Sequence, residues 1–298
     1  MTSPLHAAYY ADQAVQETVE IVENTRLAKD TFRLRFHCPP IARRILPGQF
    51  LMLRLSGLND PLIGRPLAMY DTSLSAAGEP QCVDVVYLVK GKFTSRLQAC
   101  GPGQRLDVWG PLGNGFLPRP IEHLVMVAGG IGQTPFLALA QESLGRKQFG
   151  VPGQSALRAA RTAPRAAQVT FCYGARTADY LAGVADFERL GVQVRITTDD
   201  GSAGRRGLVT ELLADVLLES AGRATHIVCC GPEPMMEAVA RLAQARQISC
   251  EVSLETPMAC GIGVCFTCVA KIRGADGEWD YQRTCVAGPV FDANCIKW

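Results

Sequence analysis

The sequence predicts an N-terminal antiparallel β-barrel, then a doubly wound α/β domain, then a small C-terminal domain built around a metal centre. Three observations indicate this order. Short β-prone segments broken by Pro and Gly fill the first third, strand and helix patterns alternate in the middle, and four cysteines gather near the C-terminus. We place the three domains at residues 14–118, 119–250 and 251–298.

Composition narrows the classes of partner. The 298 residues include 30 basic and 28 acidic side chains, which gives a formal charge of +2, and 48% of them are hydrophobic. This balance gives no support for a nucleic-acid partner. No apolar run approaches the ~20 residues of a membrane span, and residues 1–14 lack the pattern of a signal peptide. We therefore expect a soluble, cytoplasmic protein with no membrane partner.

The first third has the pattern of a small antiparallel barrel. Its β-prone segments are separated by turns such as Pro47-Gly48 and Gly101-Pro-Gly103. Many short strands with such turns are typical of closed antiparallel sheets. The predicted strands are residues 16–22, 31–37, 49–55, 67–71 and 83–89.

After Gly115 the pattern changes to alternating strands and helices, which predicts a doubly wound α/β domain. Within it, residues 145–167 are rich in Gly, Pro, Arg, Ala and Ser. We interpret them as a surface insertion of low order. The predicted strands are residues 124–128, 168–173, 192–197 and 227–230, and the predicted helices are residues 136–143, 186–190, 208–218 and 235–246.

The cysteine cluster is the most specific chemical signal. Cys260, Cys265 and Cys268 have the spacing C-x4-C-x2-C, and Cys285 follows. That spacing is typical of plant-type [2Fe–2S] ligand loops. The glycines between the first two cysteines permit the tight turns that bring thiolates onto one cluster. A structural zinc site is the alternative, although zinc sites favour paired C-x2-C knuckles and only one such pair is present.

Two glycine turns follow predicted strands of the α/β domain. Gly129-Gly-Ile-Gly132 precedes a helix, where backbone N–H groups suit a pyrophosphate. The full G-x-G-x-x-G fingerprint is absent because Pro135 stands where the third Gly would be, so a plain βα turn stays open. Gly231-Pro232 lies at the strand edge where ligands of open α/β sheets bind. Together the turns favour a nucleotide site.

Arg65 and Lys90 begin two motifs in the barrel segment, Arg65-Pro66-Leu67-Ala68 and Lys90-Gly91-Lys92-Phe93-Thr94. An Arg beside a strand can clamp a phosphate, although each motif taken alone is more typical of a charged surface. No histidine has a partner at ligand spacing, so we assign no role to His6, His37, His123 and His226.

Two longer motifs carry a resemblance to a known family. They are Glu255-Thr-Pro-Met-Ala-Cys260-Gly-Ile-Gly-Val-Cys265-Phe-Thr-Cys268 and Arg283-Thr-Cys285-Val-Ala-Gly-Pro-Val-Phe291. Thr198-Asp-Asp-Gly-Ser202 and Cys230-Gly-Pro-Glu-Pro-Met235 also match. Over residues 16–298 the sequence resembles the electron transfer subunits of NAD+-dependent dihydroorotate dehydrogenase, within the ferredoxin reductase superfamily.

The resemblance implies FAD in the barrel, NAD on the α/β domain and a [2Fe–2S] cluster in the tail, held by Cys260, Cys265, Cys268 and Cys285. It implies an FMN-containing catalytic subunit of dihydroorotate dehydrogenase as partner, in a heterotetramer. Electrons then pass from FMN through the cluster and FAD to NAD+, in pyrimidine biosynthesis. No side chain is assigned as a catalytic acid or base. The implied FAD contacts are Arg65, Pro66, Leu67, Ala68, Val86, Tyr87, Leu88, Phe93 and Thr94, and the implied NAD contacts are Gly129, Gly130, Gly132, Thr134 and Gly231.

Two positions depart from the family pattern. The family usually has Ser at position 68 and Gly at position 93. Ala68 removes a possible hydrogen bond near the flavin ring, and Phe93 is expected to crowd the backbone approach to a phosphate. NADP is an alternative to NAD, because Arg176 favours a 2′-phosphate whereas Asp199 and Asp200 disfavour one.

Two rival functions stay open. Related subunits of a sulfide dehydrogenase, a ferredoxin:NADP oxidoreductase or a hydrogenase share these domains, and the co-purifying subunit would distinguish them. A non-catalytic, zinc-stabilised binding module is the rival from another class. Absorption by flavin and an iron–sulfur cluster would distinguish it from an electron carrier.

Overall fold

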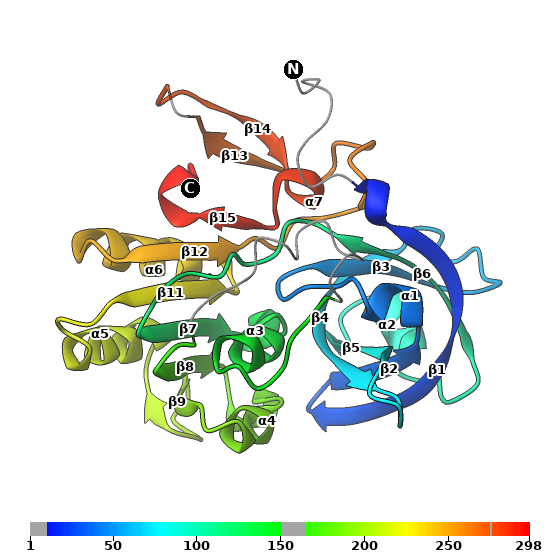
Figure 1. Cartoon of the computed structure of the whole chain (residues 1–298), viewed down its shortest axis with the longest axis horizontal. Helices are drawn as coiled ribbons and strands as arrows, with labels where there is room; N and C mark the ends of the chain where they lie inside the picture. Colours follow the sequence, from blue (N-terminus) through cyan, green and yellow to red (C-terminus); the bar gives the residue numbers. More distant parts are fainter. Residues whose placement is uncertain (1–10, 151–164, 275) are drawn as a thin grey trace.

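The computed structural model describes residues 11–150, 165–274 and 276–298. Residues 151–164 of the predicted insertion lie outside this description. Figure 1 shows a barrel beside an α/β domain, with the C-terminal tail lying across both. Within the described ranges, no helix is both long and apolar enough to cross a membrane.

The N-terminal domain is a closed antiparallel barrel, as predicted, with strand order β1-β2-β5-β4-β3-β6. In β2, Leu34 and Phe36 are buried in the barrel core while Arg33 and Arg35, the residues before each of them, stay half-exposed, which is the period-two pattern of a strand with one buried face. The elements are η1 (Ala11–Gln13), β1 (Val15–Ala28), β2 (Thr31–His37), α1 (Pro39–Ala42), β3 (Phe50–Leu55), β4 (Arg65–Leu74), β5 (Pro80–Leu88), α2 (Lys92–Leu97) and β6 (Arg105–Leu112).

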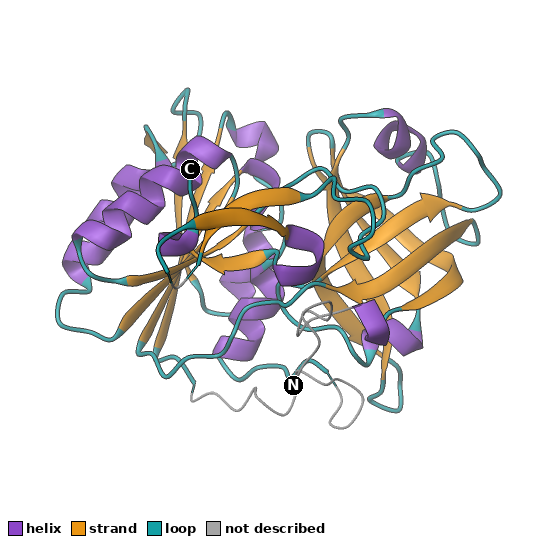
Figure 2. Cartoon of the chain, turned by 90° about the horizontal axis from the view of Figure 1, so that it is seen from above, coloured by secondary structure: helices purple, strands orange, loops and turns teal. Residues whose placement is uncertain are grey.

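The α/β domain contains a seven-stranded sheet of order β10-β9-β8-β7-β11-β12-β15. All neighbouring strands are parallel except β12 and β15. Helices cover both faces (Figure 2), which confirms the doubly wound prediction. The elements are β7 (His123–Gly129), η2 (Gly130–Gln133), α3 (Phe136–Ser143), β8 (Gln168–Ala175), η4 (Ala178–Tyr180), α4 (Val184–Arg189), β9 (Gln193–Thr198), β10 (Arg205–Arg206), α5 (Val209–Glu219), β11 (Thr225–Cys230), α6 (Glu233–Ala245) and β12 (Ser249–Ser253).

The C-terminal tail packs against both other domains. Its last strand extends the α/β sheet by pairing antiparallel with β12, and its cysteine loop shares a hydrophobic cluster with the barrel. A separate two-stranded sheet projects from it. The elements are β13 (Val269–Arg273), β14 (Trp279–Arg283), α7 (Thr284–Ala287), β15 (Val290–Asp292) and η5 (Ala293–Cys295).

Polar contacts hold the barrel against the α/β domain. The buried Tyr70 hydroxyl on β4 donates a hydrogen bond to Asp186 Oδ2 on α4 at 2.6 Å. Lys147, beyond α3, forms an ion pair with Asp71 on the same barrel strand. Since β4 begins at Arg65, these contacts fix the predicted flavin strand relative to the predicted dinucleotide domain.

Candidate functional site

The four predicted cluster cysteines come together as two thiol pairs. Cys260 and Cys265 are in hydrogen-bonding contact within the loop between β12 and β13. Cys268 ends that loop and contacts Cys285 on α7. In the described residues, no group of three or more His, Cys, Asp or Glu converges on one point to hold a single metal ion. Two separate pairs fit a [2Fe–2S] cluster, in which each iron takes two protein ligands.

Hydrogen bonds lower the pKa of one thiol in each pair. The Thr267 hydroxyl donates to Cys265 Sγ at 3.1 Å and, with backbone and Cys260 contacts, lowers the pKa of Cys265 to about 6. The hydrogen bond between Cys268 and Cys285 lowers the pKa of Cys268 to about 6 and raises that of Cys285. Each pair therefore carries a thiolate near neutral pH, which is the form that binds a metal.

Three residues of the cysteine loop have positive φ angles. Gly261 and Gly263 have φ of 73° and 83°, in the region that favours glycine. Phe266 has a φ of 56°, which is uncommon for a bulky residue. Arg283 stabilises this turn because its guanidinium stacks on the Phe266 ring at 4.8 Å and donates to the Gly263 carbonyl.

The cysteine loop packs on barrel strands β3 and β6. A Cβ added to Gly261 would meet Met52 Cγ at 2.6 Å, so the loop touches β3 directly. Trp109 Nε1 on β6 donates to the Cys260 carbonyl at 2.9 Å. Met52 pairs with Pro66 on β4. The thiol loop therefore lies one strand away from the predicted flavin motif.

Asn114, just beyond β6, ties the second half of the tail to the barrel. Its Nδ2 donates to the carbonyls of Ala287 (3.2 Å) and Val290 (2.7 Å), and Val290 N donates to its Oδ1 at 3.1 Å. Sequence analysis identified neither Asn114 nor Trp109. Their partners are distant along the chain, so no local pattern marks them.

The predicted flavin residues separate into two groups. Arg65 is exposed at the start of β4 and donates to the carbonyls of Ile63 and Gly64. Leu88 lines the cavity between the domains. The other half-buried members of this group are Pro66, Leu67, Ala68 and Thr94.

The side chains of Val86, Tyr87 and Phe93 are buried in hydrophobic clusters, so they offer a ligand only their backbone. Tyr87 stacks on Phe32 and donates to Asn24 Oδ1 at 3.1 Å. Phe93 is 1% exposed in the barrel core. Because its ring points inward, the expected crowding of a phosphate by this side chain does not arise.

A cavity of about 800 Å³ lies at the carboxyl ends of the parallel strands, as ligand sites of open α/β sheets do. Gly129, Gly130 and Gly231 line it, whereas Gly132 and Thr134 do not. Gly132 instead permits contact between the two glycine turns, because a Cβ there would lie 2.3 Å from the Cys230 carbonyl. The volume is in the range of cofactor sites.

Asp199, Arg176 and Tyr180 all line this cavity. The Arg176 guanidinium lies 5.3 Å from the Tyr180 ring centre. Asp200 does not line the cavity, and its carboxylate accepts hydrogen bonds from Ser202. Of the two predicted carboxylates, only Asp199 is placed to meet a ribose.

Glu255 is a cavity residue to which sequence analysis gave no role. It follows β12, lines the cavity and lies 4.0 Å from Cys230 Sγ. Burial raises the pKa of its carboxyl group. It opens the motif that ends in the cluster cysteines, so it connects the tail with the dinucleotide cavity.

Family models match the three parts of the chain. The FAD-binding domain of oxidoreductases matches residues 18–116, and the NAD-binding domain of oxidoreductases matches residues 126–241. The iron–sulfur cluster binding domain of dihydroorotate dehydrogenase B matches residues 255–297.

Whole-chain relatives agree with these matches. The chain is 34% identical to the electron transfer subunit of dihydroorotate dehydrogenase B (NAD+) from Desulforamulus reducens, covering 91% of this chain and 94% of that protein. It is 32% identical to the Geobacillus thermodenitrificans subunit, covering 93% and 97%.

Among solved structures, an NADH-dependent reduced ferredoxin-NADP oxidoreductase matches with a TM-score of 0.74 and 29% identity, over 94% of this chain and 90% of that one. Phthalate dioxygenase reductase matches with a TM-score of 0.59 and 15% identity, over 91% and 94%. The second likeness supports the fold alone.

Proposed function

The chain belongs to the family of dihydroorotate dehydrogenase B (NAD+) electron transfer subunits, and from this premise we propose that it carries electrons from the FMN of a catalytic subunit to NAD+. The route is a [2Fe–2S] cluster and then FAD, in pyrimidine biosynthesis. The observation that carries the proposal is the contact of the cysteine loop, which holds three of the four ligand thiols, with the barrel strand next to the flavin motif.

The chain holds and orients its cofactors, and FAD supplies the exchange between one-electron and two-electron chemistry. We propose that Arg65 clamps a phosphate of FAD through its guanidinium. Cys260 and Cys265 hold one iron, and Cys268 and Cys285 hold the other. Gly129, Gly130 and Gly231 present backbone to the dinucleotide, as their position in the cavity suggests.

Met52 and Pro66 support the order of cofactors. Neighbouring strands lie about 4.8 Å apart, and these two residues pair across β3 and β4. Met52 also touches Gly261 of the cysteine loop. A flavin on the motif that begins at Arg65 would thus lie on the side of the barrel that meets the cluster.

The exposed rim of the cysteine loop is the proposed docking surface for the catalytic subunit. Alternate residues Ile262, Val264 and Phe266 are 37%, 68% and 64% exposed beside the exposed Cys265. Exposed apolar side chains gathered on one loop are typical of an interaction site. Cys265 is the one exposed thiol of the four, so an electron can enter the cluster here from the partner.

Further parts of the proposal follow the same premise. We retain the domain limits 14–118, 119–250 and 251–298, the heterotetramer and the cytoplasmic location. The twelve cysteines form no disulfide, which suits a reducing compartment. We propose NAD rather than NADP because the relatives are NAD+ enzymes and because Asp199 at the cavity wall would repel a 2′-phosphate, against the attraction of Arg176.

The test is reconstitution with a dihydroorotate dehydrogenase catalytic subunit. Alone, the chain should oxidise NADH with an artificial acceptor and should not oxidise dihydroorotate, because we assign none of its side chains as a base for that substrate. With the subunit, dihydroorotate oxidation should reduce NAD+. Dihydroorotate oxidation by the isolated chain would refute the proposal.

The resemblance to the NADH-dependent ferredoxin-NADP oxidoreductase favours one rival, a subunit of a related flavin-based complex. Failure of every dihydroorotate dehydrogenase catalytic subunit to bind would favour it. Purification from the native cell with the subunits identified would then name the partner.

A further inference from the structure

A second cavity, separate from the dinucleotide cavity, lies on the face of the sheet that α3 covers. Its volume is about 540 Å³, and the two cavities share no lining residue. Leu124 and His226, near the starts of β7 and β11, line it. The dinucleotide cavity lies at the opposite, carboxyl ends of these parallel strands, so both cavities can be filled at once.

The inner wall of the cavity is apolar. Leu124, Leu139 and Val228 are buried and bring side chains from β7, α3 and β11 to it. Ile121, in the segment that joins the barrel to the α/β domain, adds a fourth. Such a wall accepts the body of a small organic molecule, and the volume falls within the ~300–1,000 Å³ of small-molecule sites.

The carboxylate of Glu251 on this wall is already paired with other side chains of the chain. Glu251 on β12 is 5% exposed, accepts from Arg119 Nη2 at 3.0 Å and lies 3.3 Å from His226 Nε2. Burial raises the pKa of Glu251, but the bonds and charges of His226 and Arg119 outweigh it and keep that pKa below its usual range. Arg119 Nε is buried without a partner among the described residues. Arg119 therefore keeps one buried donor without a partner next to its ion pair with Glu251.

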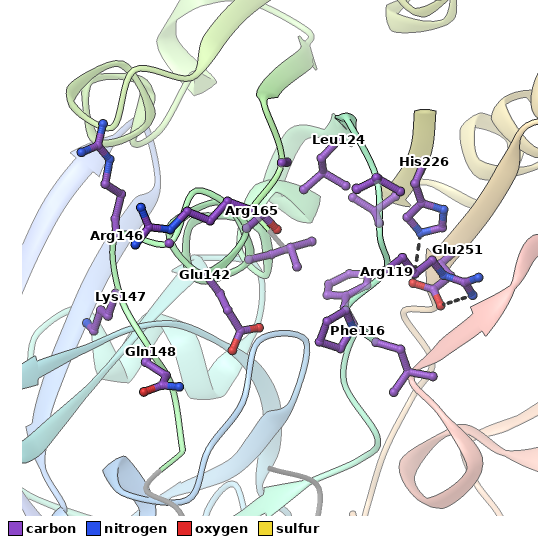
Figure 3. A pocket seen from close by; sticks show the side chains of 18 residues that line it. Phe116, Arg119, Leu124, Glu142, Arg146, Lys147, Gln148, Arg165, His226 and Glu251 are labelled. Atoms are coloured by element: carbon purple, nitrogen blue, oxygen red, sulfur yellow. Dashed lines mark hydrogen bonds and ion pairs between the residues drawn. The ribbon is translucent and has the colours of Figure 1, made fainter. Parts of the chain in front are cut away.

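The facing side of the cavity carries two guanidinium groups and one carboxylate. Figure 3 shows Arg146 and Arg165 across the cavity from Arg119, with Glu142 between them. Lys147 is paired with Asp71. Neither Arg146 nor Arg165 has a side-chain hydrogen bond or ion pair with any residue that the structure describes, so both are available to an anion.

We propose that this cavity binds an organic phosphate about the size of a nucleoside monophosphate. Arg146 and Arg165 hold the phosphate, since planar guanidinium groups match its oxygens in pairs. The organic body lies on the apolar wall. Arg119, in the segment that joins the two domains, lines the opposite side of the site.

The test uses the FAD- and cluster-loaded protein with saturating NAD+, which blocks the dinucleotide cavity. Uridine 5′-monophosphate and ribose 5-phosphate are the probes, because neither contains the adenine common to FAD and NAD. Calorimetry should detect saturable binding of at least one probe, and uridine should bind at least tenfold more weakly than its monophosphate.

The double variant Arg146→Gln/Arg165→Gln should weaken probe binding at least tenfold and leave NADH oxidation unchanged. The matched control Arg246→Gln/Arg273→Gln loses the same charge outside both cavities and should bind as the wild type does. The proposal is overturned if neither probe binds, if uridine binds as tightly as its monophosphate, or if both double variants lose binding equally.

Discussion

Asn114→Ala should release the cluster tail from the barrel without disturbing the flavin strand. The substitution removes three hydrogen bonds to the tail, those with Ala287 and Val290. Each is worth about 1 kcal/mol net, so local opening of the tail becomes easier by about 3 kcal/mol. Because about 1.4 kcal/mol is a tenfold change, the open fraction should rise about a hundredfold.

The assay is the rate of iron transfer from the loaded protein to a chelator, followed by loss of cluster absorption. If iron leaves through local opening, the rate should rise about a hundredfold in Asn114→Ala. Flavin content should stay at the wild-type level.

Asn24→Ala is a matched control, because Asn24 also makes three hydrogen bonds, with Leu97, Cys100 and Tyr87, all inside the barrel. It should loosen α2 and lower flavin retention while iron leaves at the wild-type rate. Equal acceleration in both variants, or no acceleration in Asn114→Ala, would refute the assignment of Asn114 as the tail's anchor.

Three further outcomes are expected. Cys265→Ser should lose most iron and sulfide but keep FAD, because a hard oxygen replaces a thiolate. Cys295→Ser should keep the cluster. Iron and sulfide contents of both purified proteins check this, and the reverse result contradicts the ligand set. Arg65→Ala should raise the dissociation constant for FAD about tenfold or more by removing a charge-assisted contact, and unchanged flavin retention on dialysis would rule out that contact. Burial lowers the pKa of His123 below 6.5. The unfolded chain therefore takes up the proton first, and the free energy of unfolding falls as the pH drops below that value. His123→Gln should flatten the fall in urea midpoint between about pH 7.5 and about pH 5.5, and an unchanged slope would contradict this.

Two elements appeared at their predicted places. The segment 31–37 is β2, in which Leu34 and Phe36 are buried on either side of a half-exposed Arg35. The segment 136–143 is α3, which is buried throughout from Phe136 to Gln141. β6 escaped prediction because Gly110 and Pro111 interrupt its apolar pattern. β12 and β15 are short strands whose pairing with each other depends on the folded tail, which no local pattern encodes.

The cluster ligands were predictable because metal chemistry constrains both residue type and spacing. The surroundings were not. Trp109 reaches Cys260 across 151 positions of sequence, and the inward ring of Phe93 follows from barrel packing. The three arginines of the second cavity, Arg119, Arg146 and Arg165, come from segments without a motif, so only the folded chain brings them together.

The most direct test of the central claim is an anaerobic reductive titration of the purified chain, followed at flavin and cluster wavelengths. One FAD takes up two electrons and one [2Fe–2S] cluster takes up one. The account predicts about three electron equivalents per chain, with NADH reducing flavin and cluster in the same molecule. A colourless protein that holds zinc, or a flavin that NADH reduces while the cluster stays oxidised, would contradict it.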